Sequence, residues 1–194
     1  MRLTILLLLA SAALASASPA EAPIYEIVPA ESTIAFNVKA SVAIAGKFEK
    51  WDASLTFTSP ELSTAVLDIK IQAASVNTGS GMKDGKLKGK DFFDAKQNPL
   101  ITFHSTKVEQ TGPNTVEIDG DFTIRGVTKK ERLTFALDPN RGPTSGTVSG
   151  TMAFDRKQYG MNSGIPFIKI ADRVEVAVDL RLHRIGGPAP NLKQ

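Results

Sequence analysis

His104 and His183 are the two histidines of this chain, and a metal site or a catalytic triad would draw on them first. They stand at polar positions of separate strand-like runs, and the chain has no cysteine, so no clustered set of metal ligands is evident. Serine and aspartate are common, which leaves a Ser-His-Asp arrangement open. However, the chain has neither the Gly-x-Ser-x-Gly turn of a nucleophile elbow nor a Gly-Lys-Ser or Gly-Lys-Thr phosphate loop. We therefore predict no metal, no cofactor and no catalytic residue.

A second group with chemical potential is the lysine cluster Lys83, Lys86, Lys88 and Lys90. These cations could attract an anionic lipid head group, a diphosphate or a membrane surface. They could equally form a charged and solvated loop, and both interpretations stay open. Residues 78–98 contain four glycines and no strand alternation, so we expect a loop with one or two short helical turns there.

The residues best suited to a binding site are apolar, and they recur at every second position. Ile34, Phe36 and Val38 alternate with polar neighbours, as do the valines and leucines between Val174 and Leu182. Period-two alternation predicts strands with one buried face. Runs of this kind lie at 66–72, 115–125, 131–137, 147–155 and 173–183. With shorter runs between turn-forming residues, they predict about eight or nine antiparallel strands.

One apolar face per strand leaves two packings, a two-sheet sandwich or a closed barrel. The charged opposite face argues against an outer-membrane barrel, whose outward face must be apolar. The apolar phase changes between Phe48 and Trp51. We expect a bulge near Glu49 and Lys50, because bulges help to curl a sheet into a barrel.

The amino terminus has the pattern of a secretory signal peptide. Arg2 precedes an apolar run from Leu3, and Ala15-Ser16-Ala17 supplies the small residues of a cleavage site. We expect cleavage after Ala17, with Ala20 as the other choice, and a periplasmic or secreted protein. A membrane anchor is the alternative, but the strong apolar run is far shorter than the ~20 residues that a spanning helix needs.

Residues 18–194 are predicted to form one domain, with a core at about 24–186 and a disordered C-terminal tail. The formal net charge of +3 is too small to argue for nucleic-acid binding. Without cysteine, the fold has no disulfides and depends on its apolar core.

Several segments, in this order and spacing, are similar to a known family. They are YEIVPAESTIAFNVK, GKFEKWDASLTF, LKGKDFFDAKQNPLITFHSTKV, GDFTIRGVTKK and FDRKQYGMNSG. The chain resembles the YceI-like family, also called the lipid- or polyisoprenoid-binding family, from about Ile24 to Ile185. It departs from the family at Glu31 and Ala40, where relatives often have histidine, which puts the head group of the ligand in doubt.

The resemblance implies an all-β fold, an extended lipocalin-like eight-stranded antiparallel β-barrel with a short helical or loop insertion near residues 78–98. It also implies an exported binding protein, not an enzyme, that holds a polyprenol, a quinone or a similar isoprenoid-like lipid for transport or storage. Transient membrane-surface contact and a homodimer stay open. An enzyme acting on such a lipid, and a filled structural barrel without ligand, are the alternatives.

The predicted lining residues combine the apolar phases of the strands with aromatic residues near the barrel ends. They are Phe36, Phe48, Leu67, Ile69, Phe92, Phe93, Phe103, Phe122, Phe135, Phe154, Tyr159 and Met161. For each of them, ordinary core packing is the alternative to ligand contact. At least one of the adjacent Phe92 and Phe93 is expected to face the interior.

Overall fold

Alternating apolar and polar residues form antiparallel strands in this protein, as the sequence predicts. The computed structural model describes residues 21–41, 44–138, 142, 144–164 and 169–193. The predicted signal peptide at 1–17 lies outside these residues. The described chain is a single sheet with one α-helix and several 3-10 helices.

The elements follow one another along the chain with short connections. The strands are β1 (Ile24–Ile27), β2 (Thr33–Ala40), β3 (Ile44–Phe48), β4 (Trp51–Thr56), β5 (Val66–Gln72), β6 (Val76–Asn77), β7 (Leu100–Gly112), β8 (Thr115–Ile124), β9 (Val127–Leu137), β10 (Ser145–Asp155) and β11 (Ile170–Gly186). The helices are α1 (Gly81–Lys88) and the 3-10 helices η1 (Pro29–Glu31), η2 (Leu62–Thr64), η3 (Ala73–Ser75) and η4 (Arg156–Tyr159).

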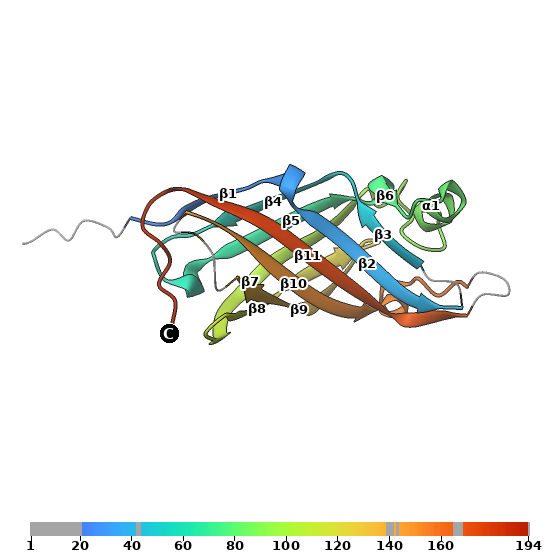
Figure 1. Cartoon of the computed structure of the whole chain (residues 1–194). Coiled ribbons are helices and arrows are strands. Elements are labelled where there is room, and N and C mark those ends of the chain that lie inside the picture. Colours follow the sequence, from blue (N-terminus) through green and yellow to red (C-terminus); the bar gives the residue numbers. More distant parts are fainter. Residues whose placement is uncertain (1–20, 42–43, 139–141, 143, 165–168, 194) are drawn as a thin grey trace, which may run out of the picture.

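The sheet curls into an elongated barrel (Figure 1). Its hydrogen-bonded order is β4-β5-β7-β8-β9-β10-β11-β2-β3-β6, and β1 pairs with β11 and lies beside β4. β3 lies next to the end of this order and β4 at its beginning, and Glu49 and Lys50 join the two directly. The chain itself therefore closes the barrel.

The sequence predicted eight or nine strands, whereas the described residues form a sheet of eleven segments. Short interruptions explain the difference: η1 separates β1 from β2, η3 separates β5 from β6, and Glu49–Lys50 separate β3 from β4. β1 and β2 pair with the same strand, β11. Counted as continuous paths, the segments form the expected eight-stranded barrel, whose interior has room for side chains or one small ligand.

A bulge was predicted near Glu49 and Lys50; the structure instead has a break between β3 and β4 at these residues, and backbone bonds hold it. The Glu49 amide donates to the Ser75 carbonyl over 3.1 Å, and the Gln72 amide donates to the Lys50 carbonyl over 2.9 Å. Across this break, the inward-facing positions change from the phase of Phe48 to the phase of Ala53.

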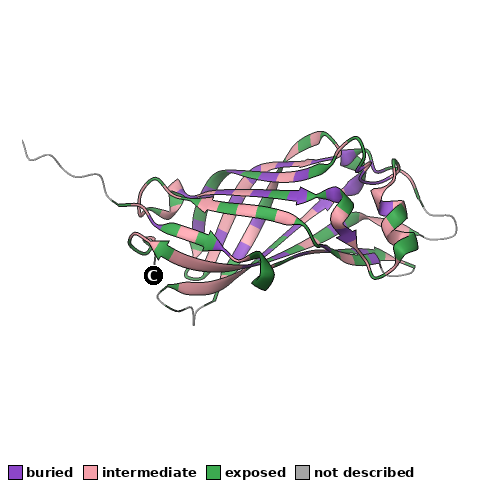
Figure 2. Cartoon of the chain, turned by 90° about the horizontal axis from the view of Figure 1, so that it is seen from above, coloured by how far each residue is buried: buried purple, intermediate pink, exposed green. Residues whose placement is uncertain are grey.

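The core lies inside the barrel, where buried positions alternate with exposed ones along the strands (Figure 2). Phenylalanines pack against glycines of the next strand, and Phe103 and Phe135 do so most closely. A Cβ atom on Gly120 would lie 2.5 Å from Cζ of Phe103, and one on Gly150 would lie 2.5 Å from Cε1 of Phe135. Each ring therefore fills space that a side chain of its neighbour would otherwise take.

The predicted insertion carries α1 at one end of the barrel (Figure 1). The Thr78 amide and hydroxyl donate to Oδ1 of Asp84 over 2.8 and 2.7 Å, which holds the first turn of the helix. The helix has eight residues. Within the described ranges, no helix combines the length and the apolarity needed to cross a membrane.

The C-terminal tail was expected to be disordered, and here the structure differs. The Asn191 amide donates to the Pro60 carbonyl over 2.8 Å. The Gln110 side chain donates to the Lys193 carbonyl over 2.8 Å and accepts from the Lys193 amide over 2.6 Å. These bonds fix the tail across the end of the barrel opposite α1 (Figure 1).

Candidate functional site

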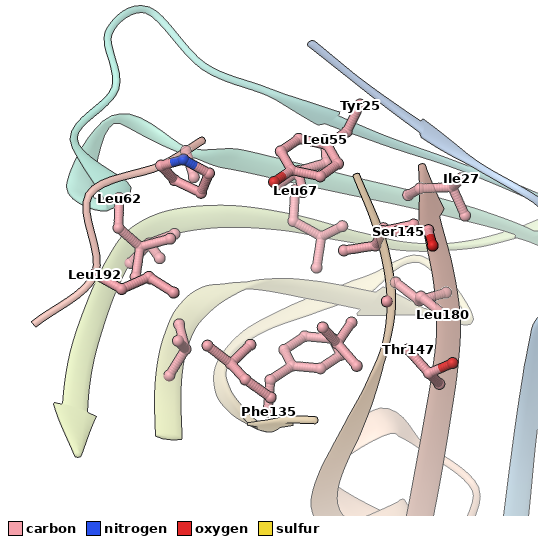
Figure 3. A pocket seen from close by; sticks show the side chains of 18 of the residues that line it. Tyr25, Ile27, Leu55, Leu62, Leu67, Phe135, Ser145, Thr147, Leu180 and Leu192 are labelled. Carbon is pink, nitrogen blue, oxygen red and sulfur yellow. The ribbon is translucent and has the colours of Figure 1, made fainter. Parts of the chain in front are cut away.

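The described residues form two apolar pockets inside the barrel, at opposite ends. The larger, which we call the tail-end pocket, has a volume of about 140 Å³. Leu67, Phe135 and Leu180 of three different strands line it, and the tail adds Pro190 and Leu192. Figure 3 shows these side chains converging, with Leu62 and Leu192 on one side and Ser145 and Leu180 on the other. The pocket is therefore a concave apolar space that the C-terminal tail partly covers.

The second pocket, the helix-end pocket, has a volume of about 70 Å³ and is mainly aromatic. Phe36, Phe48 and Phe93 form a cluster in which ring centroids lie 5.6 to 6.4 Å apart. Leu87 of α1 and Phe92, which follows the helix in the chain, also line this pocket. The distances between the rings of Phe36, Phe48 and Phe93 are typical of favourable aromatic packing.

One charged group, Arg156, borders the helix-end pocket. Its guanidinium is buried and donates to the carbonyls of Met161, Ser163 (2.9 Å) and Ala171 (3.1 Å). It also pairs with Asp172 at 3.3 Å. These partners satisfy the charge within the protein, so Arg156 ties the 156–163 segment to β11 and is not aimed at the pocket as a free cation.

Most of the predicted lining residues do face a pocket. Phe36, Phe48, Phe92, Phe93, Phe122, Phe154 and Met161 line the helix-end pocket, and Leu67 and Phe135 line the tail-end pocket. Both residues of the Phe92–Phe93 pair thus face the interior. Ligand contact by these residues stays a prediction.

Ile69, Phe103 and Tyr159 were also predicted to line the interior, but they border neither pocket. Ile69 and Phe103 lie inside the barrel, packed in the core. Tyr159 is completely buried against Phe122 and Phe154, and its hydroxyl donates to Glu131 over 2.7 Å. Burial, aided by this bond to Glu131, raises the pKa of Tyr159 well above its usual range.

The sequence prediction missed the contribution of the tail. Pro190 and Leu192 come from a Gly- and Pro-rich end with no strand alternation, so no local pattern marks them as lining residues. Leu62 lies on η2, where the alternation is also broken. Inward residues such as Val116 and Ile118 belong to a predicted alternating run, and that run was the signal that could have added them.

The two histidines lie apart from the pockets. Nδ1 of His104 is 2.7 Å from Oδ1 of Asp68 on the outer face of the barrel, where the His104 side chain is 57% exposed. His183 lies on β11 and is half-buried. Among the described residues, no group of three or more His, Asp or Glu side chains is placed to hold a metal ion.

The lysines of α1 are partly committed to neighbouring carboxylates. Nζ of Lys86 lies 2.6 Å from Oδ2 of Asp91, and this bond lowers the pKa of Asp91. The bonds from Thr78 lower the pKa of Asp84, and Lys88 adds a smaller effect. Met82 is 88% exposed at the start of the helix. The segment therefore presents both cations and one apolar side chain at this end of the barrel.

A family model described as the YceI-like domain matches residues 25–182. The chain belongs to the YceI-like family. A protein named UPF0312 protein from Pseudomonas savastanoi pv. phaseolicola is 30% identical over 134 residues, which cover 66% of this chain and 69% of that protein. The sequence resemblance is thus confirmed over nearly the whole barrel.

Solved structures share this YceI-like fold. The crystal structure of Burkholderia cenocepacia BcnA matches with a TM-score of 0.72 at 25% identity, covering 80% of this chain and 99% of that one. A polyisoprenoid binding domain from Saccharophagus degradans matches with a TM-score of 0.63 at 14% identity, over 84% and 99% of the two chains. The Campylobacter jejuni YceI protein matches with a TM-score of 0.62 at 24% identity, over 74% and 86%. The last two show likeness of fold.

Glu31, which was expected to stand where relatives often have histidine, forms an ion pair in this chain. The Glu31 carboxylate lies 3.7 Å from Nε of Arg181, and the Arg181 side chain on β11 is half-buried. Ala40 ends β2.

Proposed function

We propose that this YceI-like protein binds a hydrophobic, isoprenoid-like molecule, such as a polyprenol, a quinone or a similar chain, inside its barrel for transport or storage. The main support for this proposal is the lining of the two pockets, which consists almost entirely of apolar side chains from strands around the barrel. Apolar concave sites of this kind favour ligands that bury much of their surface. The S. degradans polyisoprenoid binding domain has the same fold, so the ligand class is compatible with it.

We further propose that the protein is exported, with residues 1–17 as the cleaved signal, and acts in the periplasm or outside the cell. There it would carry its ligand between membranes or partners. The exposed Met82 and the lysines of the α1 segment suit transient contact with an anionic membrane surface. A homodimer stays a prediction, which light scattering of the purified protein would check.

The direct test is to purify the protein from its native host, extract it with organic solvent and analyse the extract by mass spectrometry. We expect a stoichiometric isoprenoid or related lipid.

The extracted protein should bind added isoprenoid alcohols, and Val116→Thr should weaken binding several-fold, because it places a hydroxyl in the tail-end pocket at nearly constant shape. Val127→Thr is the matched control, since Val127 lies on β9 and lines neither pocket.

A filled structural barrel is the second candidate, and one observation favours it. Pockets of about 140 and 70 Å³ are smaller than the ~300 Å³ or more of common small-molecule sites. An extract without lipid, together with no binding of added isoprenoids or fatty acids, would support this second candidate and contradict the first.

An enzyme acting on a lipid is the remaining alternative, and its sequence-based candidates fit the interior poorly. His104 lies on the outer face, and the guanidinium of Arg156 is bound by carbonyls and Asp172. We therefore propose that the protein works by binding. A lipid turnover that is lost in His104→Ala would contradict this.

A further inference from the structure

The two pockets are separated by a layer of side chains at the middle of the barrel. Ile69, Phe103, Leu133 and Val178 are buried in the core, yet none of them lines either pocket. We call this layer the waist. Its members come from β5, β7, β9 and β11, which are spread along the order of the sheet.

The position of each waist residue along its own strand supports this arrangement. On β5, Ile69 stands between Leu67 of the tail-end pocket and Ile71 of the helix-end pocket. On β11, Val178 stands between Leu180 and Val176 in the same way. Because alternate residues of a strand share one face, these neighbours all point inward and differ only in their level along the barrel.

Val178 is also the middle residue of the 17-residue strand β11. About 26 Å of strand lies on either side of it at the usual rise per residue, or about 20 Å of barrel axis at the usual strand tilt. The waist therefore divides the interior into two halves of similar length.

Phe103 is the largest side chain of the waist, and its ring fills the space over a glycine of the next strand. Its register partners are Ile69 on β5 and Phe122 on β8, and its ring packs against Gly120 of β8. Since glycine has no side chain, removal of the ring would leave open space on that side. Phe103 is thus the residue whose size decides whether the two pockets communicate.

We propose that the waist, through Phe103, limits the apolar ligand to one end of the barrel, so that this protein binds short isoprenoids and excludes long polyprenols. This inference rests on the proposed binding function and adds the length class of the ligand. A short isoprenoid has to widen only one of the two pockets, whereas a long chain must also cross the waist and displace its packed side chains.

The test uses the full chain, stripped of lipid, with geraniol, farnesol, geranylgeraniol and solanesol as probes. Their binding is measured by displacement of a fluorescent apolar dye and by native mass spectrometry. We expect wild-type protein to bind farnesol at least tenfold more tightly than solanesol. Phe103→Ala should bind solanesol at least tenfold more tightly than wild type, because it joins the two pockets.

Phe135→Ala is the matched control. Phe135 is as buried as Phe103, at 4% exposure, and its ring also packs against a glycine, but it lines the tail-end pocket. This variant should enlarge one end of the interior without improving solanesol binding. If Phe103→Ala does not fold by circular dichroism, Phe103→Val removes most of the ring and keeps a residue that suits a strand.

Two results would overturn the inference, and they differ in what they leave standing. If wild-type protein binds solanesol as tightly as farnesol, the waist does not select length, although the binding function stands. If neither the wild type nor the variants bind any of the four probes, the proposed function falls together with the inference.

Discussion

At the scale of single residues, Arg156 is the charged side chain on which the helix end of the barrel depends. It is 6% exposed and satisfies three backbone carbonyls as well as Asp172. Arg156→Met should lower the free energy of unfolding by about 3–5 kcal/mol, because buried acceptors lose their partners. Urea unfolding followed by circular dichroism measures the change.

Lys157→Met is the control for this prediction, because Lys157 pairs with the same Asp172 at 2.8 Å from a half-exposed position. An exposed ion pair contributes about 0–1 kcal/mol, so this variant should be close to wild type. Equal losses in the two variants would show that the pair with Asp172, and not the carbonyl contacts, holds this segment.

Gly150 gives a second residue-scale prediction. In Gly150→Ala the new Cβ would lie 2.5 Å from the Phe135 ring, so the ring must move into the tail-end pocket. We expect a loss of about 1–3 kcal/mol in the free energy of unfolding, as for other overpacked cores. Gly85→Ala on α1 meets no atom within 4 Å and should stabilise the helix by about 0.5–1 kcal/mol. Denaturant unfolding of both variants checks the opposite signs.

At the scale of elements, the C-terminal tail is held by few contacts, and Gln110 on β7 supplies two of them. Gln110→Leu would remove both bonds to the Lys193 backbone while keeping a side chain of similar size. We expect hydrogen exchange at residues 191–193 to become faster, with little change in the strands. Exchange measured by mass spectrometry resolves the two regions.

Gln158→Leu is the control for the tail prediction, since Gln158 is an exposed residue of η4 at the other end of the barrel. Unchanged exchange of the tail in Gln110→Leu would mean that Pro60 and Glu61, which bond to Asn191, are sufficient to hold it.

At the scale of the whole molecule, the pH dependence of stability follows from groups spread over the barrel. Bonds to Thr78, to Lys86 and to Arg132 lower the pKa values of Asp84, Asp91 and Asp119, respectively. A carboxyl with a lowered pKa adds stability above its usual pKa of 3.8, and this stability is lost as pH falls below that value. Urea midpoints should therefore decrease from pH 4 downward.

Stability at alkaline pH depends on Tyr159, whose pKa is raised above its usual value of 10.0. In the unfolded chain the phenol ionises near pH 10, whereas in the folded protein it keeps its proton, so stability is lost as pH rises beyond 10. Tyr159→Phe should remove this contribution and flatten the alkaline decline of the urea midpoint. A decline as steep as that of wild type would contradict the assignment to Tyr159.

The sequence by itself determined which residues form strands and which face each residue occupies. A period of two is a local property, so alternation alone was sufficient to place Leu67, Phe122 and Phe135 in the interior. The insertion at 78–98 and the break at Glu49–Lys50 were visible for the same reason, because both interrupt a local pattern. The family resemblance then supplied the closure of these strands into a barrel.

The tertiary structure alone decided which inward residues share one level of the barrel. That level depends on the register between strands, including shifts such as the one between Ser105 and Lys107, and register is set by pairing between distant segments. For this reason Phe103 belongs to the waist and Phe135 to a pocket, although both have the same alternation. The tail is decided in the same way, since its anchor Gln110 lies 83 residues from Lys193 in the chain.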